Sequence, residues 1–145
     1  MSRLEDPRNL LERDLVLQLV TLRRDGTPRI TPLWFIHEDG ALRMTSVAGK
    51  PHLRDLARDP RCAIVISDEI EPAPDGERRY ARVRASGAAE IRSDDGGRWT
   101  RRVTLKYMPG PAGERLAERR ARDERIVITL RPARISATAS RPRHP

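Results

Sequence analysis

Residues 23–60 read RRDGTPRITPLWFIHEDGALRMTSVAGKPHLRDLARDP, and the rest of the chain is organised around them. Two Asp-Gly pairs, at 25–26 and 39–40, separate extended runs. Because glycine accepts the positive φ of a tight turn, this pattern predicts three strands joined by two turns. Lys50 then follows a glycine and precedes an amphipathic run over 51–58. A cation beside a flexible backbone and the start of a helix is a candidate site for phosphate.

Hydrophobic patterning outward from this stretch predicts a mainly β fold with flanking helices. Apolar runs and two-residue alternation predict six strands, at 15–22, 28–37, 41–46, 62–67, 80–91 and 125–133. Three- and four-residue spacing predicts helices at 3–13, 51–58, 95–107 and 113–121. Six mostly antiparallel strands with helices at the margins indicate a small closed or partly closed barrel. We expect one domain over 1–136, with an acidic surface loop at 68–78, and a disordered basic tail over 137–145.

The charge balance narrows the partners that the chain could bind. Its 145 residues carry a net charge of +8, which is typical of proteins that bind nucleic acid or an anionic cofactor. Aromatic residues make up only 3% of the chain, too few for a surface on which bases stack. Acidic residues are also interspersed among the basic ones. Nucleic acid is therefore the least favoured partner.

The single cysteine, Cys62, lies within an apolar run and is expected in the core, where no disulfide can form within the chain. No apolar stretch approaches the length of a membrane span, and the first residues lack the apolar segment of a signal peptide. These features predict a cytoplasmic protein with no membrane partner.

The usual catalytic and metal motifs are missing from the sequence. His37, His52 and His144 lie far apart on unrelated predicted elements, which disfavours a metal site. The chain has neither a P-loop nor a glycine-rich dinucleotide motif, and no serine in the context of a catalytic triad. Catalysis would therefore rest on a bound cofactor with its own reactivity, and we assign no catalytic residue.

A candidate anion site is built on the central strands instead. Arg29 opens the strand at 28–37, Thr45 closes the strand at 41–46, and Lys50 starts the helix. If these two strands are adjacent and antiparallel, Arg29 and Thr45 approach one end of the sheet, and Lys50 adds a third donor. Each charge-assisted hydrogen bond to a phosphate contributes about 1.5–3 kcal/mol. The alternative is that the three are ordinary surface groups of a basic protein.

The order and spacing of short motifs over residues 10–136 resemble the pyridoxamine 5′-phosphate oxidase-like superfamily of split β-barrels, also called flavin/deazaflavin oxidoreductases. The chain looks most like the small members described as F-420-dependent. The motifs that carry the resemblance are Thr21-Leu22-Arg23-x-Asp25-Gly26-x-Pro28, Pro32-x-Trp34-Phe35, Asp39-Gly40, Thr45, Lys50, Leu53 with Leu56, Asp59-Pro60-Arg61, Gly87-x-Ala89-Glu90, Tyr107 and Arg125-Ile126-Val127-Ile128. The resemblance implies a six-stranded antiparallel split β-barrel.

The resemblance also implies a cofactor, FMN or the deazaflavin coenzyme F-420, bound in a groove between the two subunits of a homodimer. The residues that match the cofactor-binding positions of relatives are Arg29, Ile30, Thr31, Pro32, Leu33 and Trp34 along the flavin and its phosphate, Met44 and Thr45 at the end of the third strand, Gly49 and Lys50 in the phosphate loop, and Arg82 from the second subunit. Gly49 stands where relatives have a second cation.

The implied activity is hydride transfer between the cofactor and a small organic substrate. The C-terminal Arg-x-His motif of true pyridoxamine phosphate oxidases is not recognisable, so we expect a substrate other than vitamin B6. Two alternatives of other classes stay open: a non-catalytic cofactor- or haem-binding protein on the same fold, and a basic nucleic-acid-binding barrel. The sequence leaves the choice between FMN and F-420 open.

Overall fold

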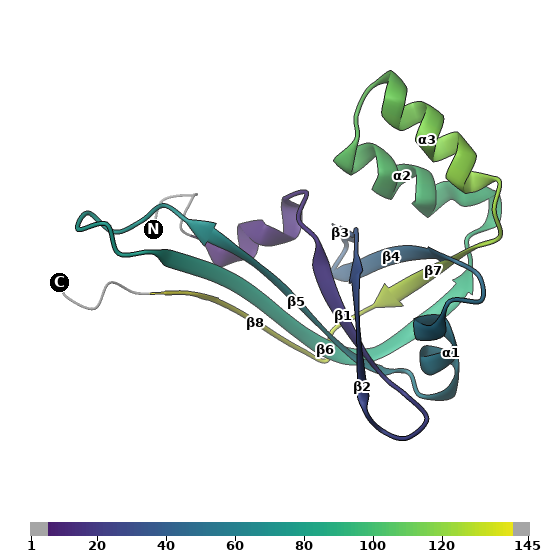
Figure 1. The fold of residues 1–145 in the computed structure, drawn as a ribbon, viewed down its shortest axis with the longest axis horizontal. Helices are drawn as coiled ribbons and strands as arrows, with labels where there is room; N and C mark the ends of the chain where they lie inside the picture. The colour runs from purple at the N-terminus through teal and green to yellow at the C-terminus, as the bar shows by residue number, and fades with distance from the viewer. Residues whose placement is uncertain (1–5, 141–145) are drawn as a thin grey trace.

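The computed structural model describes residues 6–140, which form an antiparallel sheet of eight strands with helices at its margins (Figure 1). The elements in chain order are η1 (Pro7–Glu12), β1 (Leu17–Leu22), β2 (Pro28–Leu33), β3 (Ile36–Glu38), β4 (Ala41–Val47), α1 (Pro51–Arg58), β5 (Arg61–Ile70), β6 (Arg79–Ser93), η2 (Asp95–Gly97), α2 (Arg98–Tyr107), α3 (Pro111–Ala121), β7 (Arg125–Leu130) and β8 (Arg134–Ala139). The strand order is β2-β1-β5-β6-β7-β4-β3, and β8 pairs with β6. The predicted antiparallel β fold with flanking helices is confirmed, but the sheet has eight strands instead of six.

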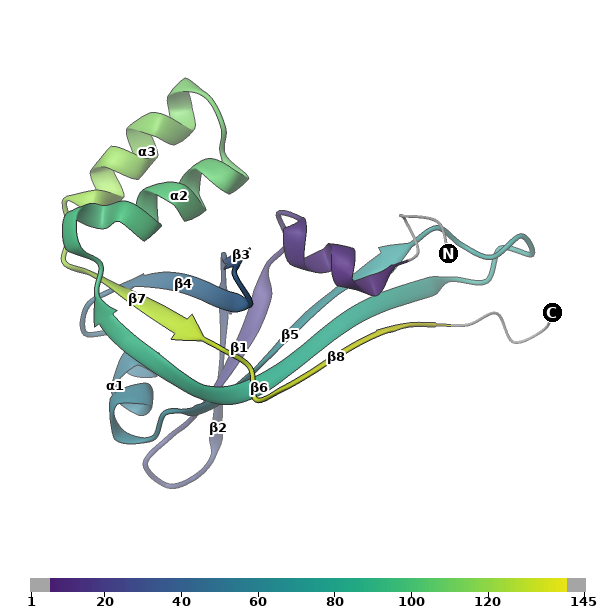
Figure 2. The same cartoon turned by 180° about the vertical axis from the view of Figure 1, so that it is seen from behind.

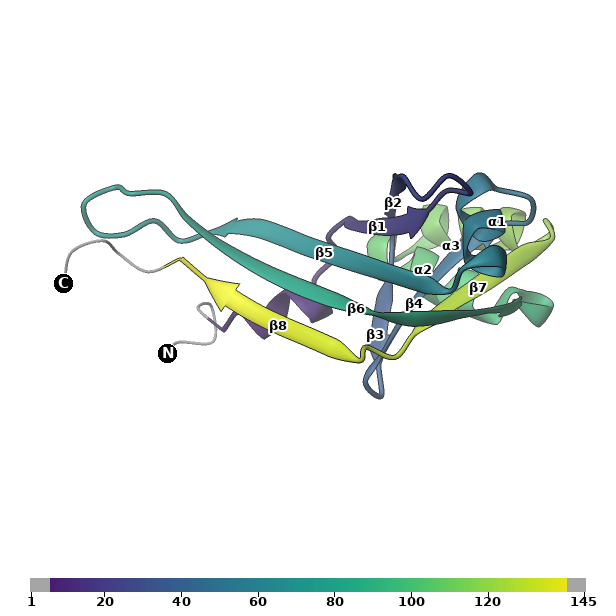
Figure 3. The ribbon, with the colours of Figure 1, turned by 90° about the horizontal axis from the view of Figure 1, so that it is seen from below.

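The long strand β6 connects the two parts of the sheet. Its residues 79–88 pair with β5, its residues 81–86 also pair with β8, and its residues 89–93 pair with β7. Figure 3 shows β5, β6 and β8 side by side along an extended arm. Near the change of partner, a Cβ on Gly87 would lie 3.1 Å from the backbone nitrogen of Ala133. A side chain there would crowd the β7–β8 connection, so glycine suits this position.

The predicted strand at 28–37 is two strands in the structure. β2 pairs with β1, whereas β3 pairs with β4. Between them, Phe35 is fully buried, and side chains of α2 bind its backbone: its N–H donates to the Tyr107 hydroxyl and its carbonyl accepts from Lys106 Nζ. These long-range partners replace a neighbouring strand. The expected adjacency of the second and third strands is therefore wrong for β2 and holds only for the short β3.

Strand β8 falls partly in the segment that the sequence predicts to be disordered. For residues 137–139 that prediction is wrong, since they pair with β6. Ala137 and Ala139 pack against the core from this strand. The small side chains of this segment do not show the alternation that predicts a strand. The segment becomes a strand because it pairs with residues 81–86 of β6. Residues 141–145 of the predicted tail lie outside the described part of the chain.

Two predicted helices are shorter than expected. The first is the 3₁₀ helix η1, and residues 3–5 of its predicted range lie outside the described residues. The predicted helix at 95–107 is interrupted because Gly96 and Gly97 both have a φ of 69°, a left-handed conformation. The helix α2 begins only after them. There the Asp94 carboxylate accepts the backbone N–H groups of Trp99 and Thr100, at 3.1 and 2.8 Å.

The helices flank the sheet at two places. α1 packs beside β1, while α2 and α3 pack together beside β4 and β7 (Figures 1 and 2). Side chains on both faces of β7 are consequently buried, as Val127 and Ile128 show. The predicted core position of Cys62 is confirmed. None of the helices within residues 6–140 is long and apolar enough to cross a membrane.

Candidate functional site

Four of the predicted cofactor-binding residues line one cavity, which lies between the end of β2 and the α2–α3 pair. We call it the helix-side cavity. It has a volume of about 280 Å³ and is lined by Val16, Pro32, Leu33, Trp34, Thr45, Val103, Arg120 and Arg125. Its lining combines apolar side chains, one hydroxyl and two guanidinium groups, and it contains no carboxylate. Such a lining fits an organic molecule that carries an anionic group.

The indole of Trp34 is held in place by two neighbours. It stacks on Tyr107, with ring centroids 4.5 Å apart and an angle of 3° between the planes. The guanidinium carbon of Arg120 lies 5.0 Å from the same ring centroid. The Tyr107 hydroxyl accepts from the N–H of Phe35 at 3.2 Å and donates to the carbonyl of Leu15 at 2.5 Å. These contacts give the cavity a rigid aromatic wall.

Thr45 reaches the helix-side cavity from β4, where it meets a buried arginine that the sequence prediction missed. Arg125 is only 8% exposed. It donates to the hydroxyls of Thr45, at 3.1 Å, and Thr100, at 3.3 Å. Burial, and then the charge of Arg120, lower the pKa of Arg125 below its ordinary value. A signal for this burial was available, since the continuous apolar run at 126–128 indicates a strand covered on both faces.

Arg29 lies in a second, separate depression. This arginine depression has a volume of about 860 Å³ and is lined by Arg23, Arg24, Asp25, Arg29, Pro51, Arg54, Asp55, Ala57 and Arg58. Five guanidinium groups against two carboxylates make it a positively charged surface. The Arg29 Nε atom donates to Asp55 at 2.7 Å, while its two terminal nitrogens donate to no group within residues 6–140. Those nitrogens remain available to an anion.

Lys50 lies beside the arginine depression, at the N-cap of α1. It is exposed and directly precedes Pro51, one of the lining residues. Gly49 has a φ of 85°, and a Cβ there would meet no other atom. The next helical residue, His52, is only 5% exposed, and its Nε2 has no partner among the described residues. Burial lowers the pKa of His52, and within the described residues its Nε2 is an unused hydrogen-bonding atom beside these cations.

The structure does not bring Arg29, Thr45 and Lys50 to one cavity. Thr45 faces the helix-side cavity, whereas the other two belong to the arginine depression or its edge. The physical reason is the strand order, which places β1, β5, β6 and β7 between β2 and β4. The arginine depression alone nevertheless fits a phosphate, because it offers several cations and has the exposed Lys50 and the open backbone of Gly49 at its edge. The assignment of these residues to a cofactor stays a prediction.

The remaining predicted residues are dispersed. Ile30 is 65% exposed on β2, and its neighbour Thr31 is half-buried. Met44 is fully buried, so its side chain belongs to the core and only its backbone could contact a ligand. Arg82 is exposed on β6, between Ser67 of β5 and Thr138 of β8. As far as the structure describes the chain, none of these four positions lines the helix-side cavity or the arginine depression.

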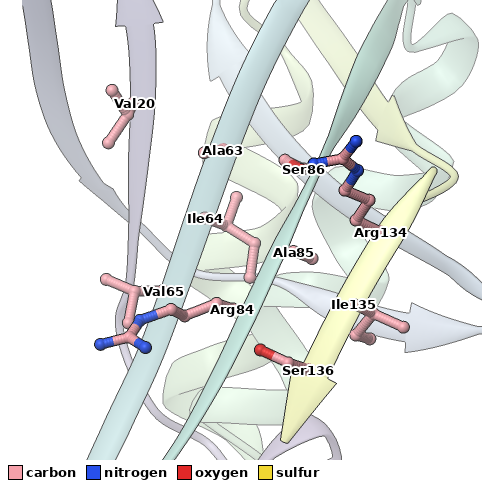
Figure 4. Close-up of a pocket in the computed structure, with 10 residues that line it drawn as sticks. All are labelled: Val20, Ala63, Ile64, Val65, Arg84, Ala85, Ser86, Arg134, Ile135 and Ser136. Atoms are coloured by element: carbon pink, nitrogen blue, oxygen red, sulfur yellow. The ribbon is translucent and has the colours of Figure 1, made fainter.

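An apolar depression lies on the outer face of the sheet, across β1, β5, β6 and β8 (Figure 4). It has a volume of about 470 Å³ and is lined by Val20, Ala63, Ile64, Val65, Arg84, Ala85, Ser86, Arg134, Ile135 and Ser136. Arg84 extends across Val65 from β6, and Arg134 lies at the other end (Figure 4). Arg82 and Arg84 are two residues apart on one strand and therefore share this outer face.

A family model described as pyridoxamine 5′-phosphate oxidase matches residues 5–139 of the chain. The chain belongs to the pyridoxamine 5′-phosphate oxidase family. This family member is similar to a solved F420 reductase, with 28% identity, a TM-score of 0.64, and 89% of this chain and 94% of that chain covered. A comparison of the sequence with curated proteins gives no match.

Two further solved structures resemble this member of the pyridoxamine 5′-phosphate oxidase family. An FAD and haem binding protein from Mycobacterium smegmatis has 25% identity and a TM-score of 0.67, with 91% of this chain and 68% of that chain covered. A conserved hypothetical protein from Mycobacterium tuberculosis has 20% identity and a TM-score of 0.72, with 89% and 79% covered. The latter likeness concerns the fold alone.

Proposed function

We propose that the chain is an oxidoreductase that binds FMN or coenzyme F-420 and transfers a hydride to or from a small organic substrate. The observation that carries this proposal is the likeness to the F420 reductase, which spans nearly the whole of both chains at 28% identity. When bound, such a cofactor supplies the hydride chemistry itself. The residues of this chain then need only to bind, orient and enclose the reactants, which agrees with the lack of a recognisable catalytic motif.

The cofactor phosphate is proposed to bind at the arginine depression, to Lys50 and the terminal nitrogens of Arg29. Lys50 is exposed and takes part in no ion pair within the described residues, so it is available as a donor. The open glycine beside it allows an anion to approach the backbone closely. On this proposal Trp34 and Thr45, at the other cavity, contact the part of the bound molecules that is remote from the phosphate.

Replacement of Lys50 by glutamate tests this assignment. We expect Lys50→Glu to weaken binding of FMN or F-420 at least tenfold while the midpoint of thermal unfolding stays the same, because the exposed side chain makes no contact that folding needs. The measurement is a separate absorption or fluorescence titration with each cofactor. Arg115→Glu is the matched control, since this residue is exposed on α3, far along the chain from the proposed site. Unchanged titration curves for both cofactors overturn the assignment.

A second copy of the chain is proposed to cover the apolar outer face shown in Figure 4. Val20, Ala63 and Val65 offer apolar area there, and nothing within residues 6–140 covers them completely. Arg82, to which the family resemblance assigns a contact from the second subunit, lies on the same face. A cofactor held between two copies would thus meet groups from both chains.

The mass of the protein in solution tests this part of the proposal. Light scattering after gel filtration is expected to give twice the 16.5 kDa of one chain. Val65→Asp places a charge in the apolar depression and is expected to yield monomers. Leu105→Asp, at a 38% exposed position on α2, is the control and should remain dimeric. A monomeric wild-type protein, or a dimeric Val65→Asp variant, contradicts the proposed interface.

The alternative is a non-catalytic protein that binds a flavin or haem on the same fold. The likeness to the FAD and haem binding protein favours it. Haem iron takes an axial ligand, commonly histidine. Of the histidines that the structure describes, His52 is buried and His37 Nδ1 lies 3.3 Å from Glu12 Oε1. Turnover of reduced cofactor with quinones, nitro compounds and tetrapyrroles supports the enzyme. A Soret band on addition of haem, without turnover, supports the alternative.

A further inference from the structure

Arg125 is a buried cation that lies outside the proposed phosphate site of the cofactor. Only 8% of the residue is exposed, and it lines the helix-side cavity. A guanidinium has five N–H donors. Arg125 uses its Nε and one Nη2 hydrogen for the hydroxyls of Thr100 and Thr45, and its Nη1 donates to no described residue. The remaining donors are unsatisfied by the part of the chain that the structure describes.

No carboxylate within the described residues pairs with Arg125 or with Arg120. The arginines that do form ion pairs lie elsewhere, such as Arg29 with Asp55. Among the described residues, the Arg120 side chain has one hydrogen bond, at 3.4 Å, to the Thr104 hydroxyl. Two cations therefore face one cavity with neutral partners alone. Asp123 and Asp94 attract the charge of Arg125 without pairing with it directly. Burying a charge without a directly paired counterion is unfavourable, so an anion between the two arginines would relieve both desolvation and repulsion.

The other residues that line the helix-side cavity indicate the chemistry of the part of the ligand that is remote from its anionic group. Pro32, Leu33 and Val103 are apolar, and Trp34 presents an aromatic ring whose position the Tyr107 stack fixes. The volume of about 280 Å³ suits a small organic molecule. A simple surface ion would leave these apolar walls without a partner. The cavity thus combines a cationic end with an apolar, partly aromatic wall.

We propose that the helix-side cavity binds a small aromatic or apolar molecule through its carboxylate or phosphate group, with Arg125 and Arg120 as the anion donors. This deepens the proposed function, on which it rests, by making the organic substrate an anion. The same anionic chemistry could also come from the cofactor, if its own phosphate enters this cavity. Arg125 is then the buried anchor and Arg120 the outer donor.

The test uses benzoate as a carboxylate probe and benzyl alcohol as its neutral counterpart, with binding measured by calorimetry on the full chain. We expect benzoate to bind and Arg120→Met to weaken it at least tenfold, while the weaker binding of benzyl alcohol stays the same. Arg125→Met should have an effect at least as large. Arg119→Met, the exposed neighbour on α3, is the matched control and should leave benzoate binding unchanged. If Arg125→Met fails to fold, the proposal is judged from benzoate binding by Arg120→Met alone.

A second arm distinguishes the two sources of the anion. FMN and riboflavin, which lacks the phosphate, are titrated into the wild type and into Arg120→Met. Loss of affinity for FMN alone assigns the anion to the cofactor, and loss for benzoate alone assigns it to the substrate. If neither benzoate nor FMN depends on Arg120 or Arg125, the proposal is wrong. Because the benzoate arm needs no cofactor, its result stands apart from that of the Lys50 titration.

Discussion

The guanidinium of Arg29 donates from Nε to Oδ2 of Asp55 across 2.7 Å and ties β2 to α1. Two more donors reach this buried carboxylate, Thr21 Oγ1 at 2.8 Å and Arg58 at 3.3 Å. Burial raises the pKa of Asp55, but the hydrogen bonds from Arg29, Thr21 and Arg58 together outweigh it, and the pKa lies below its ordinary value. Arg29 thus has a structural partner in addition to any ligand.

Replacement of Asp55 is expected to destabilise the fold. Asp55→Asn removes the charge from a group that is only 3% exposed and leaves two arginines without their counterion. We expect the free energy of unfolding at pH 7 to fall by about 3 kcal/mol, at the lower end for a broken buried pair because both arginines are partly solvated. Urea unfolding measures this, with the exposed Glu71→Gln as control. Equal stability of Asp55→Asn and the control contradicts the expectation.

Acid should act through the same carboxylate. Because the pKa of Asp55 is lower in the folded chain than in the unfolded one, its stabilisation is complete above the unfolded pKa of about 4 and is lost as the pH falls through the folded pKa. Below pH 4 the free energy of unfolding should therefore fall more steeply for the wild type than for Asp55→Asn. Parallel curves for the two proteins would show that Asp55 does not titrate differently on folding.

Lys106 should make the free energy of unfolding depend on pH in the alkaline range. Its half-buried ammonium donates to the Phe35 carbonyl, and burial lowers its pKa to about 8. The unfolded chain then binds more protons between pH 8 and 10, so stability rises with pH over this range. We expect the difference in free energy of unfolding between the wild type and Lys106→Met to shift by about 1 kcal/mol in favour of the wild type, after allowance for partial solvation.

The comparison with Lys106→Met is needed because other groups titrate nearby. Burial raises the pKa of Cys62 to about 11 and that of Tyr107 to about 12, and both reduce stability as the pH rises above their unfolded values. The Cys62 contribution is common to the two proteins and cancels in the difference. Tyr107 has its ring 5.1 Å from Lys106 Nζ, and an unfolded tyrosine titrates at about pH 10, so the comparison is made between pH 8 and 10. Lys50→Met, which removes the same charge at the exposed lysine of the chain, is the matched control. A pH-independent difference would be evidence against the burial of the Lys106 charge.

The Tyr107 hydroxyl offers a test of the aromatic wall. Tyr107→Phe keeps the ring that stacks on Trp34 but leaves the Phe35 N–H and the Leu15 carbonyl without their partner. We expect a loss of about 1–3 kcal/mol in the free energy of unfolding, with the near-ultraviolet circular dichroism of the stacked rings retained. Tyr80→Phe, at a 41% exposed tyrosine, is the control. A stability equal to that of the control would show that the hydroxyl is satisfied equally well by water.

Local patterns were enough to predict much of this fold. The helix at 51–58 has the predicted bounds because Pro51, Leu53 and Leu56 encode its start and its buried face within eight residues. The alternation along β6 likewise gave its inward side chains. The pairing of β2 with β1 follows from the predicted turn at 25–26. The separation of β3 from β2 and the existence of β8 could not be predicted in this way, since they depend on partners far away in the sequence. Phe35 interrupts a strand because two α2 side chains satisfy its backbone.

The site was predicted only in part for a related reason. One cavity is lined by four of the predicted residues, Pro32, Leu33, Trp34 and Thr45. These residues are not on paired strands, and the α2–α3 pair supplies another part of the cavity wall. Arg120 and Arg125 were not predicted as site residues, because the sequence does not show where the α2–α3 pair packs. The cavity therefore depends on the position of α3, and that position depends on Gly113 at the start of the helix.

Gly113 is the residue that allows α3 to approach α2. A Cβ at this buried position would lie 1.4 Å from the carbonyl oxygen of Met108, so the helix cannot accept alanine without moving. Alanine at an ordinary helical position stabilises relative to glycine by about 1 kcal/mol, whereas Gly113→Ala is expected to destabilise by about 3 kcal/mol or more. Since α3 carries Arg120, the same change should also weaken benzoate binding. Ala112→Gly, at the exposed neighbour, should cost only about 1 kcal/mol in urea unfolding and leave benzoate binding intact. A Gly113→Ala variant as stable as the wild type would show that the α2–α3 connection yields, and would remove this constraint on the cavity.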